Sequence, residues 1–279
     1  KMGIQIVPIS VRFGDEEFLD GVEITHEEFY TRLAECDELP KTSQPSPDTF
    51  MKVFNEAVAA GDDVLGIFIS SDLSGTYQSA CLAALDVEEE TRKKLYMVDS
   101  RSASIGTALL IREAVKLRDA GVNVSDIAAA CTEMSKYIKL TAVVGSLKYL
   151  KMGGRLSGAA AFAGTMLHIT PVVSIEDGKV VVIGKTRGKK AAEKLMHDKL
   201  IKDGLSLTRD FMFGHINCSE SLETFINKSL TYISDVNGNV GVSSIGCSVG
   251  THVGPGTYGI AYVEAAESGM NRESIVKTA

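Results

Sequence analysis

Tryptophan is absent from this 279-residue chain, and aromatic residues make up only 6% of it. So few aromatic rings argue against a surface that binds nucleic acid by base stacking. The formal net charge of −7 argues the same way, because binding nucleic acid needs a basic surface. We therefore expect no nucleic-acid partner, and we expect any large pocket to be lined by aliphatic side chains.

The sequence also has no cysteines close to one another. The five cysteines are scattered, odd in number and without a CxxC pair, which is typical of a reducing cytoplasm. No zinc-ligand spacing is present, and four of the histidines lack partners at ligand spacing. These are His26, His168, His197 and His215. We expect structural or exposed roles for them, no metal site and a cytoplasmic protein.

The chain has no long uninterrupted apolar run. We expect no secretory signal at its beginning, because Arg12 is soon followed by Asp15 and two glutamates. Two stretches, residues 156–175 and 240–263, carry no formal charge. Both are broken by glycine, hydroxyl, histidine or proline residues, so neither is a credible membrane span. We expect them to be buried or to face a ligand.

Two familiar signatures are missing too. The sequence contains no HExxH helix and no Walker A loop. A serine–histidine–acid arrangement that uses Ser74 and His252 stays open, although nothing around Ser74 resembles an activated serine.

The order of apolar segments predicts an α/β fold with two domains. In residues 1–152, strands and helices alternate, which favours a Rossmann-like, mainly parallel sheet with helices on both faces. Thr25 and Ser46 are expected to begin helices as N-caps. In residues 153–279, a hairpin signal at 176–179 and further strands indicate an α+β domain with a largely antiparallel sheet.

The sequence between Val64 and Leu85 is central to the functional interpretation. A buried apolar strand is followed by a turn rich in hydroxyls, including Ser70, Ser71 and Ser74, and then by a helix. The free N–H groups at such a helix start suit a carboxylate or phosphate, and ligands of α/β sheets bind beyond the carboxyl ends of strands. The alternative is that Ser71 or Ser74 merely caps the helix.

A second polar segment, GTHVGPG at residues 250–256, is expected to form a glycine-rich loop, and it places His252 among glycines in an uncharged stretch. Glycines let the backbone approach a ligand closely, and a histidine there can donate to an anion. The alternative is a tight loop with a surface histidine.

A basic run stands out in this acidic chain, with Lys185, Arg187, Lys189, Lys190 and Lys194 in ten residues. Such a run is either a solvated helix face or a docking surface for an acidic or phosphate-bearing partner.

Six segments follow one another along nearly the whole chain: KTSQPSP, ISSDLSGTYQSA, MVDSRSASIG, YLKMGGRLS, IEDGKVVVIGKTRGKKAAEKL and GTHVGPGTYGIAY. In this order they resemble the DegV family of bacterial fatty-acid-binding proteins. That family includes the fatty-acid-binding subunits of the two-component bacterial fatty acid kinase. Family members normally begin with a further strand and an Asp-Ser-Thr/Ser turn, so the family's first strand is expected to be missing from this sequence.

The resemblance implies a carrier that is not itself an enzyme and holds one long-chain fatty acid without a cofactor. The carboxylate would be bound by Thr42, Ser74, a backbone N–H near Gly75, and His252. The implied partner is a separate ATP-binding kinase subunit that forms an acyl phosphate for phospholipid metabolism, with transient contact to a membrane surface.

Two further sets of residues are assigned on this basis. Arg155, Arg187 and Lys190 are expected to meet the kinase subunit or the product phosphate. The acyl tunnel is expected to contain Phe162, Met166, Leu167 and Ile169 from the uncharged segment.

Two other functions stay open. One is a serine hydrolase or acyl-transfer enzyme that uses Ser74 and His252. The other is a structural or regulatory module that keeps the fold but has lost the ligand.

Overall fold

The computed structural model describes residues 2–36, 38–158, 169–206, 208–231 and 238–265. The elements of the first half are β1 (Ser10–Phe13), β2 (Glu16–Leu19), α1 (His26–Glu35), β3 (Lys41–Ser43), α2 (Pro47–Ala59), β4 (Val64–Phe68), α3 (Thr76–Asp86), α4 (Glu89–Arg92), β5 (Leu95–Asp99), α5 (Ile105–Asp119) and α6 (Val124–Met134). Those of the second half are β6 (Ile138–Val143), α7 (Lys148–Met152), β7 (Thr170–Glu176), β8 (Lys179–Thr186), α8 (Lys189–Asp203), β9 (Phe211–His215), α9 (Ser219–Leu230), β10 (Val240–Ser244), α10 (Cys247–Val253) and β11 (Tyr258–Val263).

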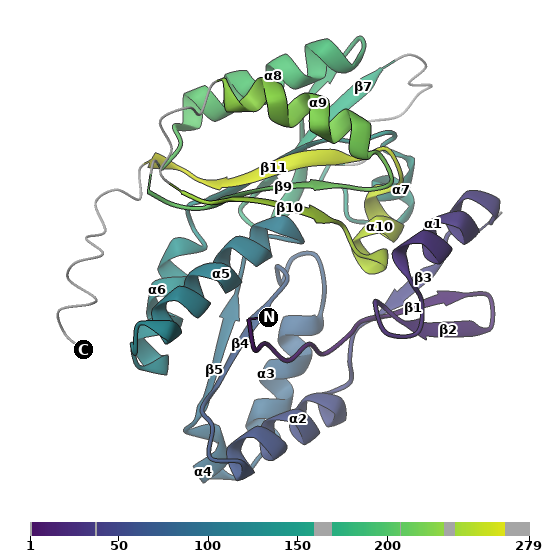
Figure 1. Ribbon diagram of the computed structural model, residues 1–279. Helices are drawn as coiled ribbons and strands as arrows, with labels where there is room; N and C mark the ends of the chain where they lie inside the picture. Colours follow the sequence, from purple (N-terminus) through teal and green to yellow (C-terminus); the bar gives the residue numbers. More distant parts are fainter. Residues whose placement is uncertain (1, 37, 159–168, 207, 232–237, 266–279) are drawn as a thin grey trace.

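The described strands form a two-stranded, a three-stranded and a six-stranded sheet. Figure 1 shows the six-stranded sheet above, the pair β4–β5 with its helices below, and the small sheet β1–β3 beside α1. Strands β4 and β5 are parallel, and helices α3 and α6 both pack on β5. The predicted α/β fold, with a parallel sheet covered by helices and a second, largely antiparallel sheet, is confirmed, and the described part of the parallel sheet is the pair β4–β5.

The six-stranded sheet has the order β10-β9-β11-β6-β7-β8, and β9–β10 is its parallel pair. Strand β6, which the sequence interpretation placed in the first domain, hydrogen-bonds to β7 and β11 in this sheet. An apolar strand does not show which sheet it will join, so this membership could not be predicted. The division at residue 152 stays a prediction.

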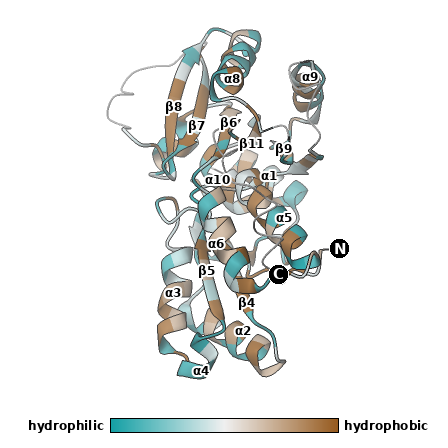
Figure 2. Cartoon of the chain, turned by 90° about the vertical axis from the view of Figure 1, so that its left-hand side faces the viewer, coloured by the Kyte–Doolittle hydropathy of each residue, from teal (hydrophilic) through white to brown (hydrophobic). Residues whose placement is uncertain are grey.

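Alternating side chains give the six-stranded sheet two buried faces. On β11, Tyr258, Ile260 and Tyr262 belong to the core under α8 and α9, whereas Ala261 packs with α5. The apolar colouring of β7 and β8 in Figure 2 fits strands that are covered by other parts of the chain. The face opposite α8 and α9 carries the candidate site.

Two helix starts follow the sequence predictions. The Thr25 hydroxyl accepts a hydrogen bond from the Glu28 N–H at 3.2 Å and begins α1. The Ser46 hydroxyl accepts one from the Thr49 N–H at 3.2 Å and begins α2. Each cap satisfies a backbone N–H that the first helical turn leaves unpaired. Among the described residues, no helix is long and apolar enough to cross a membrane.

The predicted hairpin between β7 and β8 turns through Asp177 and Gly178, whose φ angles are 48° and 82°. Positive φ at both central residues matches the twist of the flanking strands. The Ser70 hydroxyl donates to the Gly178 carbonyl oxygen at 2.7 Å. The tip of the hairpin therefore rests on the hydroxyl turn that follows β4.

Candidate ligand-binding site

A cavity lies between the six-stranded sheet and the turns that follow β4 and β5. It contains about 770 Å³ of empty space, including the part that is open to solvent. Ile69 and Leu73 reach it from the turn after β4, and Ala103 and Ser104 from the turn after β5. The cavity therefore lies beyond the carboxyl ends of the two parallel strands, where the sequence predicted a ligand.

The wall of the cavity is aliphatic. Side chains that point to one face of the sheet supply most of it: Leu140, Ala142, Val144, Val173, Ile175 and Val180. The start of α5 adds Ile105, and α10 adds Val249 and Val253. Because these side chains offer no hydrogen bonds, the wall suits a long apolar chain.

Polar side chains also line the cavity. His252, on α10, and Arg155 both line it, and the Nε2 atom of His252 lies 3.0 Å from the Oγ1 atom of Thr42 on β3. We call Arg155, His252 and Thr42 the polar end, although Thr42 contacts His252 and does not itself line the cavity. The Arg155 side chain donates to the carbonyl oxygens of Gly153 at 2.6 Å and Leu73 at 3.2 Å. Backbone contacts thus hold a positive charge beside His252.

The second ring nitrogen of His252, Nδ1, is buried and has no hydrogen-bond partner among the described residues. It lies 2.4 Å from the position that a Cβ atom of residue 153 would occupy, so Gly153 leaves the room that the ring needs. A buried polar atom without a partner costs free energy. A ligand atom at this end would remove that cost.

Burial, together with the nearby positive charge of Arg155, lowers the pKa of His252 to about 4. The ring is therefore neutral at pH 7. A neutral imidazole has one donor and one acceptor nitrogen. In this state His252 can donate a single hydrogen bond to an anion.

This pKa predicts acid sensitivity. Between pH 6.5 and pH 4 an unfolded chain protonates this histidine, whereas the folded protein does not, so the free energy of unfolding should fall as the pH falls. The loss is about 3 kcal/mol at most and is complete below the folded pKa. Urea unfolding between pH 7 and pH 4 checks this. In His252→Gln the free energy of unfolding should still fall with falling pH, but less steeply. Part of the fall remains because burial also lowers the pKa of His197 and His215. An unchanged slope in this variant would contradict the assignment.

Ser74 and Gly75 lie next to the cavity rather than in its wall. Leu73 lines the cavity, whereas the Ser74 hydroxyl lies 2.8 Å from the hydroxyl of Thr76 in the first turn of α3. Gly75 precedes α3, and the Oε1 atom of Gln44 lies 2.3 Å from the position of a Cβ atom there. Close packing of Gln44 on Gly75 thus brings the Thr42 segment to the hydroxyl turn.

The segment 250–256 was predicted to be a loop, and the structure corrects this for its first residues. Gly250, Thr251, His252 and Val253 belong to α10. Gly250 fits there because the Tyr30 hydroxyl occupies the space of a side chain, 2.2 Å from the Cβ position. The loop prediction relied on the number of glycines alone. At Gly250 the glycine reflects close packing against Tyr30 and not a turn.

The other predicted site residues are placed as follows. Phe162, Met166 and Leu167 lie outside the described residues, and Ile169 is half-buried before β7 but does not line the cavity. Arg187 and Lys190 are exposed at the start of α8. The roles assigned to these residues stay predictions.

Sequence reasoning missed two features of the site. Arg155 was assigned to the kinase subunit or the product phosphate, and its position in the cavity wall was not predicted. The strand residues of the wall were not recognised, because an apolar strand in a sequence does not show whether it faces a core or a cavity. The available signal was the two uncharged stretches, because 156–175 includes Val173 and Ile175 and 240–263 includes Val249 and Val253.

Comparison with known proteins fits this geometry. A family model described as "Uncharacterised protein, DegV family" matches residues 1–265. The chain belongs to the DegV family. A DegV domain-containing protein of Clostridium acetobutylicum is 36% identical to it, over 94% of this chain and 91% of the relative.

Solved DegV-like structures have the same fold. A fatty-acid-binding DegV family protein from Thermus thermophilus is 32% identical, with a TM-score of 0.83, over 94% of this chain and 92% of that one. A stearic-acid-binding protein from Eubacterium ventriosum is 28% identical, with a TM-score of 0.82, over 96% and 93% of the two chains. Both are described as proteins that bind fatty acids.

Proposed function

We propose that this chain binds one long-chain fatty acid, with the acyl chain in the aliphatic cavity and the carboxylate at the polar end. The observation that supports this proposal most is that one cavity combines an aliphatic wall with the polar end formed by Thr42, Arg155 and His252. The fatty-acid-binding relatives of the same fold support it.

The two parts of the ligand need different surroundings. Each buried methylene contributes about 0.8 kcal/mol, so a long chain gains affinity from an aliphatic wall. A carboxylate that leaves water requires directed donors and gains from a nearby positive charge. The Thr42 hydroxyl, the neutral ring of His252 and the Arg155 guanidinium can meet this need together.

Ser74 and Gly75 complete the head-group site in this proposal. The N-terminus of α3 carries partial positive charge, and it lies beside the cavity at Leu73. For this role the Ser74 hydroxyl exchanges its contact with Thr76 for one with the carboxylate. On this proposal the Ser74 hydroxyl changes its hydrogen-bond partner when the ligand binds. The Arg155 guanidinium is already held in place by backbone carbonyl oxygens.

The protein's role, on this view, is that of a carrier in the cytoplasm. It presents the bound acid to an ATP-dependent kinase subunit, which forms the acyl phosphate, and it needs no cofactor of its own. The exposed Arg187 and Lys190 supply positive charge for docking the subunit or touching an anionic membrane surface.

A hydrolase that uses Ser74 and His252 has less support. A catalytic serine needs its base within hydrogen-bond reach. The hydrogen bonds of the two side chains go instead to Thr76 and Thr42.

A titration with two ligands of equal length tests the proposal. Delipidated protein should bind one octadecanoic acid per chain in calorimetry. Octadecanol should bind roughly 10- to 150-fold more weakly, because hydrogen bonds to a charged group are worth about 1.5–3 kcal/mol. Failure to bind either ligand would refute the cavity assignment, and equal affinities would refute the polar end.

A further inference from the structure

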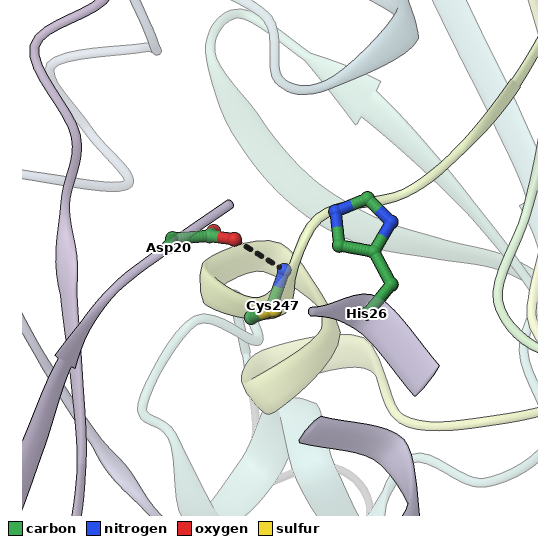
Figure 3. Close-up of side chains that lie close together, drawn as sticks. All are labelled: Asp20, His26 and Cys247. Carbon is green, nitrogen blue, oxygen red and sulfur yellow. Dashed lines mark hydrogen bonds between the residues drawn. The ribbon is translucent and has the colours of Figure 1, made fainter. Parts of the chain in front are cut away.

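Asp20, His26 and Cys247 come together at the junction of the small N-terminal sheet with α10 (Figure 3). One ligand atom from each residue lies within 4.8 Å of the other two. Asp20 follows β2, His26 is the first residue of α1, and Cys247 is the first residue of α10. The sequence prediction of no metal site relied on short ligand spacing, whereas Cys247 is more than 220 residues away from the other two.

The two ring nitrogens of His26 face different partners, as is usual for a histidine that binds a metal ion. Its Nδ1 atom lies 3.1 Å from the hydroxyl of Ser244. In Figure 3 its other nitrogen, Nε2, faces Asp20 and Cys247. When Nδ1 carries the proton and donates to Ser244, the lone pair of Nε2 points at the cluster. Histidine ligands of metals are commonly fixed by such an outer hydrogen bond.

The Asp20 carboxylate is fixed just as firmly. It accepts hydrogen bonds from the backbone N–H groups of Cys247 at 3.1 Å and Ser248 at 2.8 Å, and from the Ser248 hydroxyl at 2.7 Å. A carboxylate has about four acceptor positions. These contacts therefore leave it able to coordinate a cation while they hold its orientation.

Cys247 completes the set with a fully buried thiol. Burial raises the pKa of the Cys247 thiol, and the nearby Asp20 charge raises it further. A metal ion that binds a thiol removes its proton outright. Together, a thiolate and a carboxylate would balance the two charges of a divalent metal.

We propose that Asp20, His26 and Cys247 bind one zinc ion. Sulfur, nitrogen and oxygen donors together suit zinc better than magnesium or calcium, which prefer oxygen alone. Three protein ligands leave a fourth tetrahedral position for water. The ion would join the N-terminal sheet and α1 to α10, the helix that carries His252. This proposal does not rest on the proposed fatty-acid function.

The competing explanation is that Asp20 only caps α10. A substitution separates the two roles, because the single amide oxygen of asparagine still accepts a hydrogen bond from one of the two backbone N–H groups at the start of α10. Asp20→Asn should therefore keep the fold but lose one negative ligand.

Cobalt(II) is the probe, titrated into the full chain without an affinity tag. We expect one ion per chain, with a sulfur-to-cobalt charge-transfer band and the visible bands of a tetrahedral site, all removed by added zinc. Cys247→Ser should lose the charge-transfer band. Asp20→Asn and His26→Gln should bind no cobalt(II) at the protein concentration at which the unmodified chain binds it. Ser244→Ala should bind about 10- to 100-fold more weakly.

Cys81→Ser is the matched control, because Cys81 is a half-buried thiol on α3, away from the cluster, and its loss should change nothing. Absence of cobalt uptake by the unmodified chain overturns the proposal, as does full uptake by His26→Gln. If Cys247→Ser does not fold, His26→Gln decides, because the half-buried His26 is the variant least disruptive to the core.

Discussion

Ala142→Phe should weaken fatty-acid binding roughly 50- to 1,000-fold while the protein stays folded. Ala142 lies on β6 in the middle of the apolar wall. A phenyl ring there points into the cavity and takes space that three to five methylenes of the ligand would fill. At about 0.8 kcal/mol for each methylene, this costs about 2.4–4 kcal/mol. Calorimetric titration with octadecanoic acid measures the change.

Thr141→Val is the matched control for this variant. Thr141 is the neighbouring residue on the same strand, and the alternation of the strand directs it to the other face of the sheet. Its hydroxyl is buried and has no hydrogen-bond partner among the described residues, so valine replaces it at little cost. Binding should be unchanged. Unchanged binding in Ala142→Phe, with circular dichroism confirming the fold, would show that the ligand lies elsewhere.

The double variant Thr42→Val/Ser74→Ala should weaken binding of octadecanoic acid roughly 10²- to 10⁴-fold. Each substitution removes a hydroxyl assigned to the carboxylate, and a hydrogen bond to a charged group is worth about 1.5–3 kcal/mol. Fluorescent fatty-acid displacement or calorimetry gives the dissociation constants. Because octadecanol has no carboxylate, its affinity should change far less.

Ser43→Ala controls for a general effect of altering β3. Ser43 follows Thr42 on the same strand but is exposed, so this substitution should leave binding intact. Equal losses for the acid and the alcohol in the double variant would mean that the two hydroxyls support the fold of the site rather than the carboxylate.

The parts of the fold that were predicted correctly depend on local chemistry. The Thr25 and Ser46 caps are each a hydroxyl at a helix start, and the hairpin turn at Asp177-Gly178 needs positive φ. The parallel pair β4–β5 follows from a strand, a helix and a strand in succession. By contrast, the partners of β6 are set by contacts with β7 and β11, which no local pattern reveals.

The candidate site also depends on contacts between segments that are distant in the sequence. Thr42 and His252 were assigned to one site through the family resemblance, and the structure places them 3.0 Å apart although 210 residues separate them. Arg155 could not be placed at the cavity from sequence, because its position depends on the carbonyl oxygens of Leu73 and Gly153. A basic residue in a sequence does not reveal whether it faces solvent or a ligand.

The most direct test of the central claim is the lipid content of the protein as it leaves the cell. Protein purified without detergent or organic solvent is extracted, and the extract is analysed by mass spectrometry against the amount of protein. We predict one long-chain fatty acid per chain, and much less from Ala142→Phe prepared in parallel. A protein that carries no fatty acid, and takes up none when octadecanoic acid is added, would contradict the account.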